Sequence, residues 1–369
     1  KNGFSYVLDR ADGKLLRANP YATVTWASHV DMETGRPVEN PDLDYEKQEQ
    51  WVLPGPLGAH NWQAMSVDEE AGVVYIPAQD NPLIYGLSDE WKQSGIYKRN
   101  PNGWNTGLEF GRITQLVVDN IADQPTPKGY LKAFDPLTGK DKWVVEIPHY
   151  WNGGVLSSAG GLVFQGDALG MLTAYDKDNG EALWQFNTYT SMLAPPITFE
   201  IDGVQYLSIL TGTGGGDLFG GEPLPPVSEH ASLTYNNYGR LLVFKVGGAE
   251  ELPVPTVRDR TIPVQANLTA SNDQIAAGER HYNNYCAVCH GLAVRSGGSI
   301  PDLRRMSEGT HTVFNQIVQD GLLAANGMAA FSDVVSDEDT TNIHHYVRAR
   351  AEQDRLAAAG EGGGQLTWQ

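Results

Sequence analysis

A repeated segment constrains the fold of this chain more than any other feature of its sequence. Residues 133–143 read AFDPLTGKDKW and residues 174–184 read AYDKDNGEALW, so both fit the pattern A-x-D-x-x-x-G-x-x-x-W. This pattern is typical of a strand, a tight turn and a returning strand, because aspartate accepts backbone hydrogen bonds in the turn and glycine takes a positive φ. The tryptophan is predicted to pack on the neighbouring unit. A weaker copy without tryptophan covers residues 7–16.

The spacing of the copies predicts the architecture. Asp135 and Asp176 are 41 residues apart, which suits propeller blades of four strands each better than stacked helical repeats. The 41 glycines and the charged fraction of 19% also suit a β-rich protein with many turns. We count about four blades in residues 1–246, too few to close a free-standing ring comfortably. Further strands are predicted over residues 72–78, 161–166, 204–210 and 239–246.

The pattern changes after the last predicted strand. Residues 247–272 form a proline-spaced, extended segment that cannot hold a helix, and we interpret them as a linker. A small all-α domain is predicted over residues 273–355, followed by a flexible tail of residues 356–369. Ser336 marks one helix start, because three acidic residues follow it. The predicted helices cover residues 274–285, 311–321 and 337 to about 352.

The two cysteines of the chain lie in the run Cys286-Ala287-Val288-Cys289-His290. C-x-x-C-H is the attachment signature of c-type haem: both thiols bond the haem and the imidazole ligates iron. A disulfide, a redox dithiol and a zinc site are the alternatives, although zinc would need two more ligands at a compact spacing. Met328 is the candidate for the second axial ligand, with core filling as its alternative. Iron ligated by both His290 and Met328 would have no open coordination position for a substrate, so it would only transfer electrons.

Net charge and hydropathy exclude some kinds of partner and a transmembrane segment. The formal net charge of -19 would repel nucleic acid and anionic lipid, so a basic or neutral partner is expected. No stretch approaches the roughly 18 apolar residues of a transmembrane segment. The first residues do not form a signal peptide and read as a turn entering a strand, so an upstream portion is expected. The haem attachment signature predicts a periplasmic protein.

Three segments carry a family resemblance: residues 1–10 (KNGFSYVLDR), residues 58–62 (GAHNW) and residues 151–164 (WNGGVLSSAGGLVF). Together with the tryptophan hairpins and the cytochrome segment, they make the chain similar to the quinohaemoprotein alcohol dehydrogenases. Members of that family join an eight-bladed propeller to a C-terminal cytochrome c domain. The resemblance implies an all-β propeller of the eight-bladed type, of which about four blades are present, followed by a small all-α cytochrome c domain.

The resemblance also implies cofactors and an activity. The family oxidises an alcohol to an aldehyde or ketone with pyrroloquinoline quinone, and the electrons leave one at a time through haem c. By motif, Lys1 would hydrogen-bond the reactive quinone oxygens, while Asn61 and Trp151 would contact the edge of the cofactor. A cationic donor there would stabilise the negative charge that develops as hydride arrives. The alternatives are a solvated end for Lys1, a turn role for Asn61 and packing for Trp151.

The family's aspartate base and calcium ligands belong to a region before Lys1, so the resemblance places both upstream of this chain. Asp80, Asp167 and Asp217 lie in loops, where turn capping is the more frequent role, and we name no catalytic base. Expected electron acceptors are a soluble cytochrome c, a blue copper protein, or a membrane quinone reached through other subunits. The alternative is a non-catalytic electron-transfer cytochrome in which a partial propeller serves as a docking module.

Overall fold

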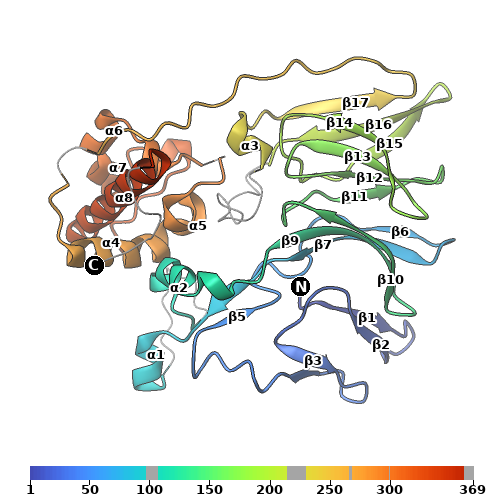
Figure 1. Cartoon of the computed structure of the whole chain (residues 1–369), viewed down its shortest axis with the longest axis horizontal. Coiled ribbons are helices and arrows are strands. Elements are labelled where there is room, and N and C mark those ends of the chain that lie inside the picture. Colours follow the sequence, from blue (N-terminus) through green and yellow to red (C-terminus); the bar gives the residue numbers. More distant parts are fainter. Residues whose placement is uncertain (97–106, 214–229, 266–267, 299, 361–369) are drawn as a thin grey trace. The chain divides into compact units, whose positions relative to one another are not determined.

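The computed structural model describes residues 1–369 except residues 97–106, 214–229, 266–267, 299 and 361–369 (Figure 1). Two compact units are present. The first contains Lys1–Ile84 and the strands that follow residue 123, and the second contains Tyr85–Ala122 and the C-terminal helices.

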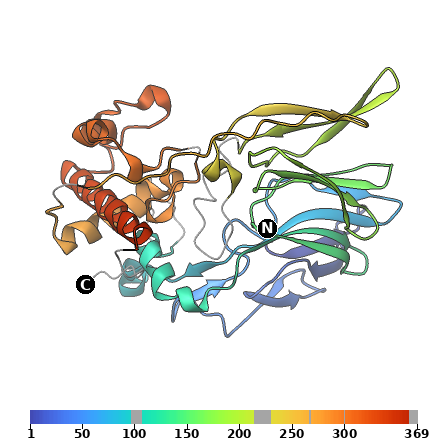
Figure 2. The same ribbon diagram turned by 45° about the horizontal axis from the view of Figure 1, so that its top comes forward.

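The first unit consists of antiparallel sheets, which Figures 1 and 2 show stacked in chain order, as propeller blades are. One four-stranded sheet has the order β10-β9-β7-β6, with β6 Ser66–Asp68, β7 Val73–Asp80, β9 Lys128–Asp135 and β10 Lys140–Ile147. The next follows chain order through β11 Val155–Ser157, β12 Leu162–Gly166, β13 Met171–Asp176 and β14 Ala182–Asn187. A three-stranded sheet follows, made of β15 Ile197–Ile201, β16 Val204–Thr211 and β17 Arg240–Lys245.

Three two-stranded sheets complete the described strands. They pair β1 Phe4–Leu8 with β2 Leu15–Pro20, β3 Ala27–Val30 with β4 Pro37–Glu39, and β5 Gln50–Val52 with β8 Leu83–Tyr85. The strands predicted from residues 72–78, 161–166, 204–210 and 239–246 are confirmed as β7, β12, β16 and β17.

The repeated segment folds as its pattern predicts. Asp135 Oδ1 accepts hydrogen bonds from the backbone N–H groups of Leu137 and Thr138 at 2.8 and 3.2 Å. The indole of Trp143 donates to the carbonyl of Lys177 at 2.9 Å. Its ring lies against Gly180, where an added Cβ would be 2.8 Å from the ring. The tryptophan of one repeat therefore packs on the turn of the next, and glycine is required at the point of contact.

A further copy of this turn escaped the sequence pattern. Asp31 Oδ1 accepts from the backbone N–H groups of Glu33 and Thr34 at 2.8 and 2.9 Å, and Gly35 has a φ of 72°. This turn joins β3 to β4. The D-x-x-x-G spacing was present in the sequence, but the flanking alanine and tryptophan were not, so the local turn chemistry alone identifies it.

The second unit holds five α-helices after residue 270: α4 Asn272–Tyr285, α5 Ala287–His290, α6 Glu308–Thr312, α7 Phe314–Asp320 and α8 Asp337–Ala358. Ser336 caps α8 as predicted, since its hydroxyl accepts from the backbone N–H of Asp339 at 3.1 Å. The single helix predicted over residues 311–321 is wrong. Val313 leaves the helical region with a φ of -107° and a ψ of 15°, so the chain breaks into α6 and α7 and buries Phe314.

Helices α4 and α8 cross at close range. An added Cβ on Gly278 would collide with the backbone carbonyl of Asn342. Beside this crossing, the rings of Tyr282 and Tyr346 lie 5.3 Å apart, and neither is exposed. The shared core of the helices contains Tyr282, Ala287, Val294, Met306, Phe314, Val318, Val335, Ile343, Tyr346 and Val347.

Between β8 and β9 the chain has an insertion that the sequence did not single out, and the structure describes it except for residues 97–106. It contains α1 Asp89–Ser94, the 3-10 helix η1 Phe110–Arg112, α2 Ile113–Asp119 and the 3-10 helix η2 Ile121–Asp123. Helix α2 buries Ile113, Leu116 and Val117, which share one face by their i, i+3, i+4 spacing.

The segment after β17 has no regular secondary structure over residues 247–265, as predicted from its prolines. Arg258 in this segment donates to the carbonyl of Ser232 at 3.0 Å. Within the described part of the chain, no helix combines the length and the apolar character that a bilayer crossing needs.

Candidate haem and quinone sites

Helix α4 leads directly into the cysteine run. The backbone N–H of Cys286 donates to the carbonyl of Tyr282 at 2.8 Å, at the end of α4. The N–H of His290 donates to the carbonyl of Cys286 at 2.9 Å, within the short helix α5. Both thiols are free, Cys289 is exposed, and burial raises the pKa of the Cys286 thiol to about 12. A helical turn places residues three apart on one side. Cys286 and Cys289 therefore lie about one helical turn apart.

A backbone carbonyl fixes the orientation of the His290 ring. Its side chain is 7% exposed, and its Nδ1 lies 3.0 Å from the carbonyl oxygen of Pro301. Because a carbonyl can only accept, Nδ1 carries the proton and Nε2 keeps its lone pair for a metal. Burial also lowers the pKa of His290, which favours the neutral ring. The sequence analysis missed Pro301, since a backbone carbonyl leaves no side-chain signal.

A left-handed turn fixes the chain after His290. Gly291, Ala293 and Val294 have φ values of 80°, 54° and 64°. An added Cβ on Gly291 would collide with the carbonyl of Arg295. Left-handed backbone is costly for a β-branched residue and persists only where the surrounding structure enforces it. Here the buried hydroxyl of Tyr282 donates to the carbonyl of Gly291 at 2.8 Å, and so ties the turn to α4.

Met328 lies in the loop between α7 and α8. Its backbone N–H donates to the carbonyl of Leu323 at 3.3 Å, and its half-buried side chain packs on the same core as Cys286. The structure thus brings Met328 to the core that carries the cysteine run. Among the described residues, no group of three or more His, Cys, Asp or Glu side chains is arranged to hold a metal ion.

The first unit brings Lys1, Asn61 and Trp151 together around one leucine. Lys1 Nζ and Asn61 Nδ2 both donate to the backbone carbonyl of Leu57, at 3.4 and 2.9 Å. The side chain of Leu57 packs on a cluster that contains Trp151, which is 3% exposed. Gly58, with a φ of 79°, permits this approach, because an added Cβ would lie 2.9 Å from the Cα of Lys1. Three residues far apart in the sequence therefore form one cluster.

Two parts of this chain match known protein families. The family described as "Glucose/ethanol/alcohol dehydrogenase, beta-propeller domain" matches residues 145–207, and the one described as "Cytochrome C oxidase, cbb3-type, subunit III" matches residues 273–347. Quinohemoprotein alcohol dehydrogenase ADH IIB of Pseudomonas putida is 43% identical over 97% of this chain and 49% of its own length. Nearly all of this chain therefore matches about half of a quinohaemoprotein alcohol dehydrogenase.

Solved structures of the family agree. The quinohemoprotein alcohol dehydrogenase ADHIIG from Pseudomonas putida HK5 superposes with a TM-score of 0.82 at 34% identity, over 98% of this chain and 52% of that one. The quinohemoprotein alcohol dehydrogenase from Comamonas testosteroni superposes with a TM-score of 0.76 at 31% identity, over 95% of this chain and 50% of that one. The resemblance and the fold class predicted from the sequence are confirmed. The chain spans about half the length of the curated relatives it matches.

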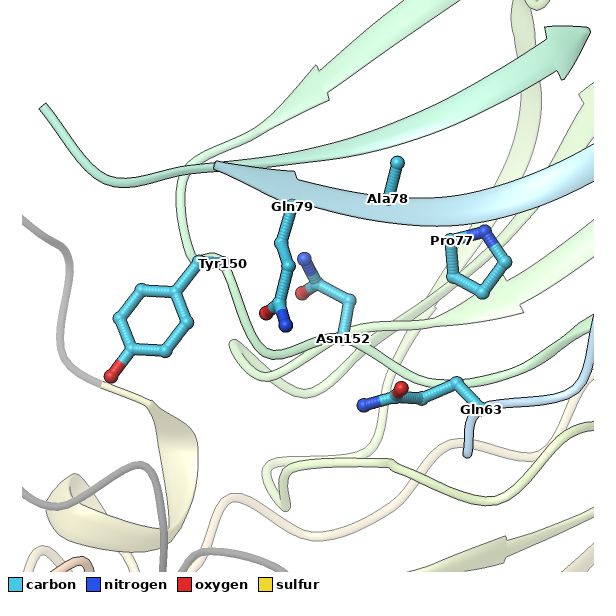
Figure 3. A pocket seen from close by; sticks show the side chains of 6 residues that line it. All are labelled: Gln63, Pro77, Ala78, Gln79, Tyr150 and Asn152. Carbon is cyan, nitrogen blue, oxygen red and sulfur yellow. The ribbon is translucent and has the colours of Figure 1, made fainter. Parts of the chain in front are cut away.

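Beside the quinone-site candidate Trp151 lies a narrow polar pocket. Figure 3 shows the side chains of Gln63, Gln79 and Asn152 pointing toward one another, while the ring of Tyr150, which also lines the pocket, is directed away from them. Gln79 donates to the carbonyl of Gly58 at 2.8 Å, which links the pocket to the Lys1 loop.

A buried histidine also holds the backbone of Trp151. Its N–H donates to Nδ1 of His149 at 3.0 Å. Burial, with the nearby His230, lowers the pKa of His149 to about 3, so the ring stays a neutral acceptor.

Asp80 and Asp167 have structural contacts, although Asp80 is the last residue of β7 and does not lie in a loop as expected. Asp167 Oδ1 accepts from the backbone N–H of Met171 at 2.7 Å within the β12–β13 turn, and burial raises its pKa to about 6. Asp80 accepts from the hydroxyl of Thr23 at 2.6 Å. Asp217 lies outside the described residues. These contacts fit turn and loop bracing, and we assign no base.

Proposed function

We propose that this chain carries haem c and pyrroloquinoline quinone and takes part in the oxidation of an alcohol to an aldehyde or ketone. Electrons would pass one at a time from the quinone to the haem and then to an external acceptor. The observation that carries this proposal is the convergence of Lys1 and Asn61 on Leu57 in a chain that also bears the C-x-x-C-H run. Its relatives include proteins named quinohemoprotein alcohol dehydrogenase and 1-butanol dehydrogenase (cytochrome c).

The helical unit supplies the residues for the haem. Cys286 and Cys289 would form the two thioethers, which the free thiols on one side of a helical turn support. His290 would ligate the iron through Nε2, and Met328 would ligate it from the other side. A bound haem c supplies one-electron transfer. The Pro301 carbonyl keeps the proton on Nδ1, and so keeps the ligating nitrogen of His290 free.

The first unit supplies residues for the quinone, which accepts two electrons when bound. The Lys1 ammonium would donate hydrogen bonds to the reactive quinone oxygens, where developing negative charge is stabilised by a fixed cation. Asn61 and Trp151 would contact the cofactor edge through an amide and an indole. Among the described residues we assign neither a catalytic base nor calcium ligands.

Location and partners belong to the same proposal. Covalent haem attachment supports a periplasmic protein. The net charge of -19 supports a basic acceptor, such as a soluble cytochrome c or a blue copper protein. Transfer to a membrane quinone through other subunits is the alternative route, and comparison of the two acceptors with the purified protein would separate them.

The proposal is tested on the complete protein, loaded with quinone, calcium and haem. Addition of a primary alcohol without oxygen should reduce the haem, as followed by its absorbance. A Cys286→Ala/Cys289→Ala variant provides the control without covalent haem. If alcohol leaves the haem oxidised while dithionite reduces it, the proposal is wrong, and a non-catalytic electron-transfer cytochrome with a docking module is favoured instead.

A further inference from the structure

The 3-10 helix η1, in the insertion between β8 and β9, packs on α4, the helix that leads into the cysteine run. The chain enters it from β8 and leaves it into β9, both sheet strands, yet Tyr85–Ala122 groups with the C-terminal helices in one compact unit. Within that unit, η1 packs directly on α4. We call this contact the η1–α4 seam and define it by Gly111, Arg112, Glu279 and Asn283.

A buried hydrogen bond holds the seam together. Asn283 is fully buried, and its Nδ2 donates to the backbone carbonyl of Gly111 at 3.0 Å. Gly111 is itself buried, and an added Cβ would lie 3.2 to 3.6 Å from atoms of Glu109, Asn284 and Arg280. A larger side chain at Gly111 would therefore push η1 away from α4. Asn283 precedes Cys286 by less than one helical turn, so the bond grips α4 where it meets the cysteines.

A second buried polar side chain of α4 faces the seam. Glu279 lies one turn before Asn283 on the same face of α4, is 8% exposed, and its Oε1 meets no hydrogen-bond partner among the described residues. Burial of this carboxyl costs free energy, which the other contacts of the seam have to offset. The charged groups that act on it come from every element around it: Arg350 (α8), Arg112 (η1), Arg280 (α4) and Asp119 (α2).

We propose that the insertion is a second tether of the haem domain, which fixes the haem-carrying end of α4 and makes Asn283 a positioning residue for electron transfer. The other connection to the C-terminal helices runs from β17 to the start of α4, and its residues 247–265 have no regular secondary structure. The insertion is covalently anchored at both ends, to β8 and to β9, and grips α4 through buried contacts. The proposal rests on the proposed function only in placing a haem on Cys286 and Cys289.

Cleavage of the first connection tests the tether without any catalysis. A recognition sequence for a site-specific protease is inserted between Arg258 and Asp259 of the haem-loaded protein. After cleavage, the fragment with covalent haem should still co-elute with the remaining chain on size exclusion. It should separate in the Asn283→Ala and Gly111→Leu variants. Separation of the parent protein after cleavage, or full retention in both variants, would overturn the proposal.

Asn315→Ala is the matched control. Asn315 lies on α7, and its Nδ2 donates to Asp337 at 2.9 Å, so the substitution removes an asparagine hydrogen bond of the same domain without touching the seam. This variant should retain the haem fragment after cleavage. Separation in this variant would show that general loss of helical stability, and not the seam, governs retention.

A second measurement on uncut protein separates positioning from general damage. Asn283→Ala should slow haem reduction by alcohol on the order of tenfold, because a small displacement of a positioned group is costly. The haem reduction potential and the rate of reduction by dithionite should not change. A shifted potential or an unchanged rate would contradict a positioning role. If alcohol fails to reduce the haem even in the parent protein, the proposed function fails, while the cleavage result still decides the tether.

Discussion

Lys1 and Asn61 donate hydrogen bonds to the same acceptor, the backbone carbonyl of Leu57, at 3.4 and 2.9 Å. A carbonyl oxygen has two lone pairs, so it can accept both. An ammonium group has three donors, and only one of them is directed at Leu57. The shared acceptor therefore holds two side chains from distant parts of the sequence while leaving donors of Lys1 for a ligand.

Replacement of the Lys1 cation tests this arrangement. Lys1→Gln keeps a donor of similar length but removes the charge, and should lower kcat for alcohol oxidation by about 10²-fold. Steady-state kinetics with an artificial electron acceptor measures the effect, and the amount of bound quinone is determined in parallel. Lys14→Gln, in the exposed β1–β2 turn, is the control and should retain activity. Equal activities of the two variants would contradict the role of Lys1.

The two methionines of the helical core should behave differently. Met328→Leu removes the proposed thioether ligand, and should lower the haem reduction potential by on the order of 0.1 V, since axial ligands set potentials over about 0.8 V. Met306→Leu changes a buried methionine of the same core and should leave the potential unchanged. Spectroelectrochemical titration measures both. An unchanged potential in Met328→Leu would mean that this methionine only fills the core.

The crossing of α4 and α8 predicts a steep cost at Gly278. Gly278→Ala would drive a methyl group into the carbonyl of Asn342, and should lower the free energy of unfolding by about 1–3 kcal/mol. Gly309→Ala is the matched control, because the nearest atom to its added Cβ is 3.7 Å away, and it should stabilise by about 0.4–1 kcal/mol. Denaturant unfolding followed by haem absorbance provides the comparison. Equal effects would show that the helices can separate without cost.

The buried carboxyl of Glu279 predicts a pH dependence of stability. Burial, opposed most by Arg350, raises the pKa of Glu279 from 4.5 to about 7. Between these values the folded protein binds more protons than the unfolded chain, so the free energy of unfolding should fall as the pH rises. Glu279→Gln should remove this decline and stabilise the protein on the order of 1–3 kcal/mol above neutral pH.

Denaturant unfolding at about pH 5 and about pH 8 measures this effect for both proteins. Glu250→Gln, in the exposed segment after β17, is the control and should leave the pH dependence unchanged. A decline of the same size in Glu279→Gln and in the parent would assign the pH dependence to other groups.

The acidic surface predicts a salt-sensitive acceptor reaction. With a net charge of -19, electron transfer to a basic cytochrome c should slow by on the order of tenfold as the ionic strength rises, because screening shortens the range of attraction. Stopped-flow measurement of acceptor reduction tests this, with a small uncharged acceptor as the control. Equal salt dependence for both acceptors would argue against electrostatic docking.

Short-range chemistry explains what the sequence determined. The D-x-x-x-G turns, the cap at Ser336 and the C-x-x-C-H run each depend on contacts within a few residues, so the residue types at a fixed spacing were sufficient to predict them. The linker was also predictable, because proline disrupts the interior of a helix and the prolines of this segment are closely spaced. The family resemblance, carried by short motifs of the same kind, also followed from the sequence alone.

The tertiary structure decided the features that depend on backbone atoms or on distant partners. The Leu57 carbonyl that joins Lys1 to Asn61, and the Pro301 carbonyl that orients His290, carry no side-chain signal. The break at Val313 arises because burial of Phe314 overrides local helix propensity. The η1–α4 seam pairs residues 172 positions apart, and such long-range packing is fixed only when the whole chain has folded.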